Sequence, residues 1–570
     1  MLHRRLILLM VLWCSVPCSA QSLPDIKTVK IAGISFVPVK WDKQANWNRL
    51  ASFCRQASAA GAKILITPEG ILEGYLINEV LRSKERPQID QRFLEISETQ
   101  DGPFVTKVRN LAKELRVHLI LGYSERDRDW IYGSAMWIGP DGQIIHNHRK
   151  THLAEGYFDP PFYRPGWETN AFDTEYGRMG MMICYERQVP EVARALAADG
   201  ARFIVVPSYG SRGEWNDAMI RTRARENGAS MIFCHPQQSL IADHQGKILV
   251  NQQSEGIAYA EINISPGPWP SFRFRRPEAF IDNLSVYGVN QRSSRPDHIR
   301  VAAIQMLGRH SLAANLQQIK GYLAQCSRQG VRVALFPECI TTGYYREDII
   351  QYTEKELLDA EETIAACCKE NSIYAIIGTP AFQKGERYNT ALVISPQGEK
   401  IYRQAKIQLT EGDAKWARAG NRLSTFKIDD ITCSLIICHD SRYPELVRLP
   451  VMKGARLVFY LSWESDIRSE LKLDPYRAQV QARAVENVVY IVHANAPQRL
   501  SPQLEGSHGQ SRIVDPKGNL MKEASIFAEE VLTADLDMQK AHGDTALKSW
   551  RPEFLKTFWQ TGVDQIGQAP

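Results

Sequence analysis

The sequence predicts an α/β protein built from two copies of one layered domain. Three observations support this prediction. The chain has 570 residues, which is long enough for two large domains. Short runs of valine, isoleucine and leucine alternate with helical patterns along the chain. One ordered set of motifs also occurs twice.

Each copy begins with a β-rich run, at residues 29–34 and 299–305, and a helical pattern follows each run. A second apolar run, at residues 62–69 and 331–338, ends in Pro-Glu and has Gly-Tyr at the same spacing beyond it. Apolar runs of this length predict buried strands. Each of these strands therefore carries a glutamate at its carboxyl end.

Later segments of the two copies match in the same order. The matched pairs are 149–156 with 405–412, 182–187 with 436–442, 223–227 with 483–487, and 276–278 with 551–553. The offset between the pairs drifts, which indicates insertions and deletions in loops. Units of this length are too long for a solenoid repeat, so they are two copies of one domain. The sequence predicts a first domain at residues 21–290, a linker at 291–298 and a second domain at 299–570.

Residues 1–20 have the pattern of a signal peptide. Arg4 and Arg5 precede a short apolar run, and small residues end at Ala20, so Gln21 is the expected first residue after cleavage. The apolar run is shorter than the roughly 20 residues that cross a bilayer comfortably. The sequence therefore predicts an exported protein, periplasmic or secreted, with no stable membrane span after cleavage.

The charge balance excludes one class of partner. The chain carries 69 Lys and Arg against 64 Asp and Glu, a net charge of +5. A chain so close to balance has no basic footprint for nucleic acid. The cysteines are irregularly spaced and match no zinc motif. We therefore expect a small-molecule substrate and no nucleic acid.

Each copy offers one ordered set of reactive side chains. The sets are Glu69, Lys150 and Cys184 in the first copy, and Glu338, Lys406 and Cys438 in the second. A thiol attacks well only as a thiolate, so it needs a base or a cation nearby. Attack on an amide or nitrile carbon also needs a group that neutralises the developing negative charge. Taken singly, each residue is typical of a surface charge or a core cysteine, but the ordered recurrence indicates a site.

Both copies resemble the nitrilase, or carbon–nitrogen hydrolase, superfamily, whose mark is a Glu-Lys-Cys triad in this order. The resemblance covers nearly the whole chain after the signal segment, twice. It implies two tandem α-β-β-α sandwich domains and neither a metal nor an organic cofactor. It also implies that the glutamate is the general base, that the lysine stabilises the tetrahedral intermediate, and that the cysteine forms a covalent acyl thioester.

The same resemblance implies a second glutamate that helps to position the cysteine and the substrate. This residue matches Glu155 in the first copy and Glu411 in the second. The backbone N–H of Tyr185 or His439 would complete the oxyanion site. The first copy departs from the family pattern at Glu186, where many relatives carry aspartate.

The loops after the two cysteines differ strongly, at residues 208–214 and 462–468. This difference leaves open whether both sites are active and whether they share a substrate. Relatives pair two domains through helices next to the cysteine strand, so one chain with two copies is expected to form an intrachain pseudo-dimer, with higher oligomers left open. Four matched charged residues are expected to form ion pairs in the helices and the core, namely Arg223, Glu226, Arg483 and Glu486.

We interpret the chain as an exported hydrolase of non-peptide carbon–nitrogen bonds. Its expected substrate is a linear amide, an N-carbamoyl compound or a nitrile, cleaved through an acyl-thioester intermediate. Two alternatives stay open. One is an N-acyltransferase on the same scaffold, and the other is a non-catalytic binding module that retains the fold.

Overall fold

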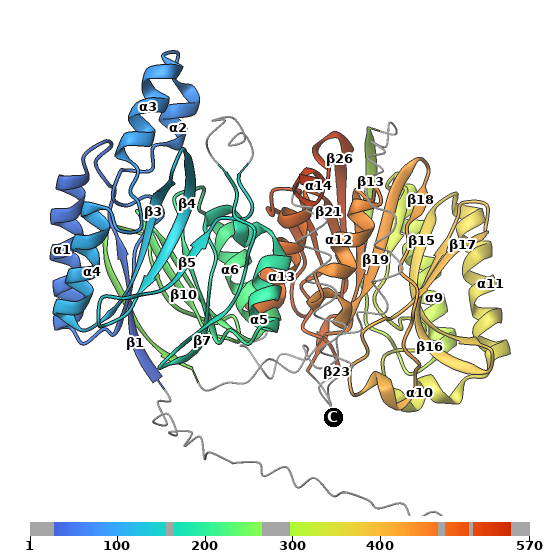
Figure 1. Ribbon diagram of the computed structural model, residues 1–570. Coiled ribbons are helices and arrows are strands. Elements are labelled where there is room, and N and C mark those ends of the chain that lie inside the picture. Colours follow the sequence, from blue (N-terminus) through green and yellow to red (C-terminus); the bar gives the residue numbers. More distant parts are fainter. Residues whose placement is uncertain (1–27, 155–163, 265–296, 465–472, 501–504, 549–570) are drawn as a thin grey trace, which may run out of the picture.

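The computed structural model describes residues 28–154, 164–264, 297–464, 473–500 and 505–548. Two similar halves lie side by side, with helices of both halves between them (Figure 1). The predicted signal peptide at residues 1–20 lies outside the described residues, as do Glu155 and most of the predicted linker. The matched segments 276–278 and 551–553 lie outside them as well.

Within its described residues, the first half contains two six-stranded sheets. The first sheet has the order β12 (Gly256–Asn263), β1 (Thr28–Ser35), β2 (Ile64–Ile66), β3 (His118–Asp127), β4 (Trp130–Ile138) and β5 (Ile144–Arg149). The second sheet has the order β11 (Ile248–Gln252), β10 (Gln238–Ala242), β9 (Ser230–His235), β8 (Phe203–Pro207), β7 (Gly177–Met181) and β6 (Phe172–Thr174). The described helices are α1 (Lys43–Ala59), α2 (Ile77–Arg82), α3 (Arg86–Ile96), α4 (Pro103–Leu115), the 3-10 turn η1 (Cys184–Gln188), α5 (Pro190–Ala198) and α6 (Glu214–Asn227).

The second half repeats this plan. Its first sheet has the order β17 (Lys400–Ala405), β16 (Glu386–Ile394), β15 (Tyr374–Gln383), β14 (Val333–Leu335), β13 (His298–Gln305) and β26 (Glu530–Asp537). Its second sheet has the order β18 (Phe426–Ile428), β19 (Ile431–Ile437), β20 (Leu457–Leu461), β21 (Tyr490–Ala494), β24 (Arg512–Val514) and β25 (Leu520–Glu523). β22 (Gln498–Arg499) and β23 (Glu505–Gly506) pair antiparallel as a separate two-stranded sheet. The described helices are α9 (Leu312–Arg328), α10 (Arg346–Gln351), α11 (Glu354–Asn371), η3 (Asp413–Lys415), η4 (Cys438–Arg442), α12 (Glu445–Met452), α13 (Leu473–Asn487), η6 (Met538–Lys540) and α14 (Asp544–Lys548).

The layers follow from the way the strands bury both faces. In β1, Val29 and Ile31 pack between the two sheets, whereas Ala32 and Ile34 pack against the outer helices α1 and α4. Successive strand residues point to opposite faces, so a strand covered on both sides is apolar throughout. The second half has the same arrangement, with α9 and α11 outside its first sheet (Figure 1). Each half is therefore an α-β-β-α sandwich, as the resemblance implies.

The two halves meet through α6 and α13, which pack against each other. Arg223 contacts Glu226 of its own helix at 2.6 Å and Glu486 of the other half at 2.5 Å. Arg483 contacts Glu486 at 2.7 Å and also reaches Glu226. All four side chains are buried. These residues form ion pairs as expected, but half of the pairs cross between the halves and join them.

Two general properties hold for the described part of the chain. Its nine cysteines are all free thiols. Within the same residues, no helix combines the length and the apolar character needed to cross a bilayer.

Candidate active site

In the second half, the three predicted residues follow three strand ends. Glu338 comes after β14, Lys406 comes after β17, and Cys438 opens η4 directly after β19. Because β14 and β17 belong to one sheet and β19 to the other, the site lies where strands of both sheets end. Glu338 and Lys406 are completely buried, and Cys438 is half-buried.

A glycine makes room for each of the two glutamates, Glu338 and Glu69. A Cβ atom on Gly378 would lie 2.3 Å from the carbonyl oxygen of Pro337, and a Cβ on Gly122 would lie 2.3 Å from the carbonyl oxygen of Pro68. Both distances are far shorter than any real contact of a Cβ atom. Only glycine therefore allows β15, and β3 in the first half, to approach the Pro-Glu segment this closely. The two halves share this packing.

Lys406 is held between two carboxylates. Its Nζ lies 2.7 Å from Oε1 of Glu338 and 2.8 Å from Oδ2 of Asp413. Glu338 Oε1 also accepts a hydrogen bond of 2.7 Å from the Asn389 side chain, and its Oε2 accepts one of 3.0 Å from the backbone N–H of Trp463. Buried charges need such partners to offset their lost hydration. The cluster therefore has one well-determined geometry.

The predicted second glutamate, Glu411, does not join this cluster. Its side chain is exposed, and Asp413 occupies the place beside Lys406. The local turn explains this correction. The backbone N–H of Thr410 donates to Asp413 Oδ2 at 2.9 Å, and the Asp413 N–H donates to the Thr410 hydroxyl at 3.1 Å. This reciprocal pair resembles a capping box and turns Asp413 inward.

The charges of the site follow from burial and pairing. Burial raises the pKa of the Glu338 carboxyl, and it raises the pKa of the Cys438 thiol well above its ordinary value. Burial also opposes the charge on Lys406, but the negative charges around it raise its pKa well above the usual range. For Asp413, burial is outweighed by Lys406 and by hydrogen bonds, and the pKa falls to about 2. At neutral pH, Lys406 and Asp413 form an ion pair beside a neutral thiol.

Cys438 sits on a strained turn. Its φ of +46° lies in the left-handed region, which is uncommon for a residue with a side chain. Asp440 holds this turn in place, because its carboxylate accepts N–H groups of Ile437 at 3.2 Å and of Gln408 at 2.7 Å. The same carboxylate therefore ties the cysteine turn to the segment that follows Lys406.

The thiol opens on a cavity of about 420 Å³. The lining residues are Tyr344, Thr410, Cys438, His439, Ser441, Arg442, Trp463, Glu464 and Tyr476. The rings of Tyr344 and Trp463 stack with 6.0 Å between centroids and form an aromatic wall. A cavity of this size with an aromatic wall and a few polar groups suits a small molecule.

The first half repeats part of this arrangement. Glu69 follows β2 and Lys150 follows β5, and Lys150 Nζ lies 2.7 Å from Glu69 Oε1. Both side chains are buried. The second oxygen of Glu69 is buried and accepts no hydrogen bond from any described residue. The predicted Glu155 lies outside the described residues.

Cys184 has the same strained backbone as its counterpart, with φ of +48°, and is 4% exposed. The guanidinium of Arg187 lies 3.6 Å from its sulfur and donates to its carbonyl oxygen at 2.5 Å. Glu186 accepts the N–H groups of Ile183 and Thr151, each at 2.7 Å. The glutamate that departs from the family pattern thus ties the cysteine turn to the lysine segment, as aspartate does in the second half.

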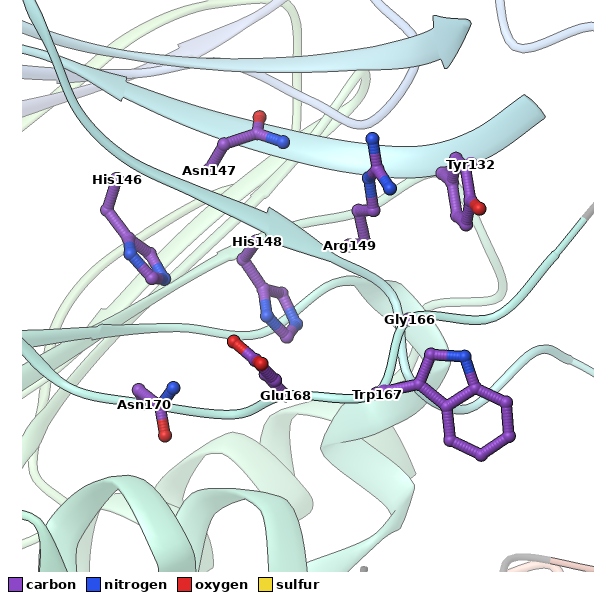
Figure 2. Close-up of a pocket in the computed structure, with 9 residues that line it drawn as sticks. All are labelled: Tyr132, His146, Asn147, His148, Arg149, Gly166, Trp167, Glu168 and Asn170. Carbon is purple, nitrogen blue, oxygen red and sulfur yellow. The ribbon is translucent and has the colours of Figure 1, made fainter. Parts of the chain in front are cut away.

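The first half also has a hollow of about 310 Å³ beside β5. Figure 2 shows His146 and His148 leaving one side of this strand toward Glu168, whereas Asn147 and Arg149 leave the other side. Cys184 does not line this hollow, so it is separate from the predicted site. Within the described residues, no group of His, Cys, Asp and Glu side chains could hold a metal ion.

Sequence reasoning missed several residues of the second site. Asp413 and Asn389 contact Lys406 and Glu338 directly, yet neither has a matching residue that marks it in the first copy. Tyr344 belongs to the matched Gly-Tyr motif, and its hydroxyl donates to Asp413. That motif was the signal that could have identified it.

Comparisons with known proteins decide the family. A family model described as carbon-nitrogen hydrolase matches residues 29–266 and again residues 300–543. The chain belongs to the carbon–nitrogen hydrolase family. It is therefore an enzyme that cleaves carbon–nitrogen bonds, and it contains two copies of the hydrolase domain.

Curated relatives of this hydrolase match one copy at a time. Citrullinase from Francisella tularensis subsp. tularensis is 27% identical over 276 residues, which are 42% of this chain and 93% of that protein. Nitrilase from Pyrococcus abyssi is 30% identical over 248 residues, which are 41% of this chain and 90% of that protein. Among solved structures, an amidase from Nesterenkonia sp. aligns with a TM-score of 0.41 and 25% identity, covering 48% of this chain and 99% of that one.

Proposed function

We propose that the second half hydrolyses a linear amide at Cys438, and that the first half has the equivalent nucleophile in Cys184. The observation that carries this proposal is the buried Glu338–Lys406 pair next to a thiol that opens on a cavity. Relatives support an amide substrate. Besides the citrullinase, a 2-oxoglutaramate amidase from Bacillus subtilis is 28% identical over 212 residues, which are 37% of this chain and 79% of that protein.

Acylation begins with the neutral thiol of Cys438. Glu338 accepts the thiol proton while the sulfur attacks the amide carbon, which forms the C–S bond. The Lys406 ammonium and the backbone N–H of His439 stabilise the negative oxygen of the tetrahedral intermediate. Glu338 then returns the proton to the nitrogen, the C–N bond breaks, and ammonia leaves an acyl thioester.

Deacylation uses water in place of the thiol. Glu338 accepts a proton from a water molecule as its oxygen attacks the thioester carbon. The C–S bond breaks, Cys438 recovers its proton, and a carboxylic acid leaves. Lys406 keeps its positive charge throughout because Asp413 stays ionised beside it when Glu338 takes up a proton. It therefore acts as a fixed electrostatic stabiliser and not as a base.

Single and double cysteine variants test this function. Cys438→Ala, Cys184→Ala and the double variant are compared with the wild type for ammonia release across amides, N-carbamoyl amino acids and nitriles. We expect the double variant to lose about a thousandfold or more of the activity. Intact mass should show an acyl adduct on the wild type that the double variant lacks. Undiminished ammonia release by the double variant contradicts the mechanism, and product formed only with an added amine indicates acyl transfer.

We also propose that the protein is exported. The support is the sequence of residues 1–20, in which two arginines, a short apolar run and small residues follow one another. Cell fractionation with N-terminal sequencing tests this proposal. The expected mature chain begins at Gln21, and a cytoplasmic chain that begins at Met1 contradicts it.

A further inference from the structure

Arg225 belongs to α6 of the first half but lies against the active site of the second. It is 6% exposed, and its guanidinium carbon lies 4.7 Å from the ring centroid of Tyr476, which lines the cavity beside Cys438. Its Nε atom is buried and makes no hydrogen bond to any described residue. A buried cation with so few polar partners favours a negative group nearby.

A second arginine reaches the same tyrosine. Arg442 lines the cavity, and its Nη2 donates to the Tyr476 hydroxyl at 3.1 Å. Tyr476 therefore has one guanidinium over its ring and another at its hydroxyl. Burial, and then the charge of Arg442, lower the pKa of Arg225 to about 10, so both arginines are charged at neutral pH. The two cations are close enough to destabilise each other.

Among the described residues that line the cavity, Glu464 carries the one carboxylate, and its charge favours that of Arg225. Burial and then Arg442 hold the pKa of His439 well below its usual range, so His439 is uncharged at neutral pH. Glu464 is negative, with a pKa of about 2, because the hydrogen bond from His508 and other neighbours outweigh its burial. Its two oxygens accept the Tyr460 hydroxyl and contact His508 Nε2, each at 2.5 Å. Glu464 therefore offsets part of the positive charge, and the two arginines, Arg225 and Arg442, outnumber this carboxylate among the described residues around Tyr476.

The opposite half offers no such arginine. Arg223 and Glu226 of α6 match Arg483 and Glu486 of α13, so Arg225 matches Val485. Val485 packs in an apolar cluster with Met219, Ala482 and Trp215. The interface is therefore symmetric in its ion pairs but asymmetric at this position, where the first half has a cation and the second half has an apolar side chain.

We propose that Arg225 determines substrate specificity across the domain interface, by giving the Cys438 cavity, together with Arg442, a positive end that selects amides bearing a carboxylate away from the scissile bond. This inference rests on the proposed amidase function of Cys438. Arg225 acts as a positioning residue through its charge, so it should change substrate binding more than the chemical step.

The test uses the full chain with Cys184→Ala, so that turnover reports Cys438 alone. Two amides of equal length are compared, butyramide and succinamate, which replaces the terminal methyl group by a carboxylate. Arg225→Met should raise the KM for succinamate about tenfold, equivalent to ~1.4 kcal/mol, with kcat changed less than about twofold. Its kcat/KM for butyramide should stay within about twofold of the parent.

Three further variants and one further substrate make the result specific. Arg225→Lys keeps the charge and should retain most of the preference for succinamate, whereas Arg225→Gln should lose it. Arg225→Gln also replaces Arg225→Met if the latter does not fold in a thermal unfolding assay. Val485→Ala, at the matched position, should leave both amides unaffected. The cationic 4-aminobutyramide should bind better to Arg225→Met than to the parent.

Two outcomes distinguish a failure of this inference from a failure of the proposed amidase function. If the parent hydrolyses neither amide, the proposed function fails for these substrates and the inference fails with it. If the parent hydrolyses butyramide, but Arg225→Met and Arg225→Gln change both amides by the same factor, the function stands and the role of Arg225 is overturned.

Discussion

Replacing Asp413 by asparagine removes one of the two carboxylates that hold Lys406. Asp413 Oδ2 lies 2.8 Å from Lys406 Nζ and accepts two hydrogen bonds of 2.9 Å from the N–H and the hydroxyl of Thr410. Its other oxygen accepts the Tyr344 hydroxyl. An asparagine keeps the shape of this group but replaces one acceptor oxygen by an NH₂ donor. This NH₂ group would face either the Lys406 cation or the hydroxyl donor of Tyr344.

The magnitude follows from the pKa of Asp413. Burial raises this pKa, but Lys406 and the hydrogen bonds outweigh burial and lower it from 3.8 to about 2. A depression of this size corresponds to about 2 kcal/mol of folding free energy at neutral pH. Because the folded-state pKa is the lower one, the stabilisation is fully present above pH about 4 and is lost as the pH falls through about 2. Asp413→Asn should be about 2 kcal/mol less stable than the wild type at pH 7, and the difference should vanish in acid.

Activity gives an independent measure of the same substitution. In Asp413→Asn, Lys406 still contacts Glu338 but loses its other negative partner, so the pKa of Lys406 should fall. The alkaline limb of the pH–rate profile should therefore move to lower pH. We expect kcat/KM for an amide to fall about a hundredfold at pH 7. Denaturant unfolding between pH 2 and 8 measures the stability, and ammonia release over pH measures the rate.

The control is Glu411→Gln, two residues earlier, where the side chain is exposed. It should change the folding free energy by less than about 0.5 kcal/mol. If Asp413→Asn behaves like Glu411→Gln in stability, in rate and in pH profile, then Asp413 does not hold Lys406 in the way that the geometry indicates.

Two further substitutions test the interface and the base. Arg223→Met leaves the buried carboxylates of Glu226 and Glu486 with one arginine fewer, and should cost about 3–5 kcal/mol in denaturant unfolding. Asn389→Ala removes a hydrogen bond of 2.7 Å to Glu338 Oε1. It should lower kcat about tenfold while KM changes little, because the proposed base is less well oriented, and steady-state ammonia release measures both.

Matched surface variants serve as controls for these substitutions. Arg55 pairs with Glu114 at 3.2 Å, and both side chains are exposed, so Arg55→Met should cost no more than about 1 kcal/mol. Asn519→Ala removes an exposed hydrogen bond to Asp515 and should leave kcat unchanged. An interface variant no more destabilised than Arg55→Met would show that the buried ion pairs contribute little.

The fold and the ordered sets of glutamate, lysine and cysteine were predicted from the sequence because the same motifs recur in both copies. A buried strand must end at the edge of its sheet, so a glutamate directly after the strand lies at that edge. This reasoning placed Glu338 at a strand end, and the structure also places Lys406 and Cys438 after strands and brings Glu338 and Lys406 into contact. The catalytic roles of these residues remain predictions that the cysteine variants test.

The residues that sequence reasoning missed depend on local turns or on the other half of the chain. Whether Glu411 or Asp413 faces Lys406 depends on a single turn, closed by two hydrogen bonds with Thr410. A match between two sequence segments does not show which side chain of such a turn faces inward. Sequence reasoning missed Arg225 for a different reason, because its neighbour Tyr476 lies 251 residues away in the other domain.

The joining of two domains in one chain has a physical consequence for the sites. In a symmetric homodimer, an interface residue occurs twice and acts on both sites equally. Here α6 and α13 keep the symmetric ion pairs that join the halves, yet position 225 is arginine and position 485 is valine. A single chain can therefore charge one active site across the interface and leave the other unchanged. Replacing Val485 by arginine should consequently alter only the substrate preference of Cys184, measured with Cys438→Ala, and an equal effect on both sites would contradict this one-sided coupling.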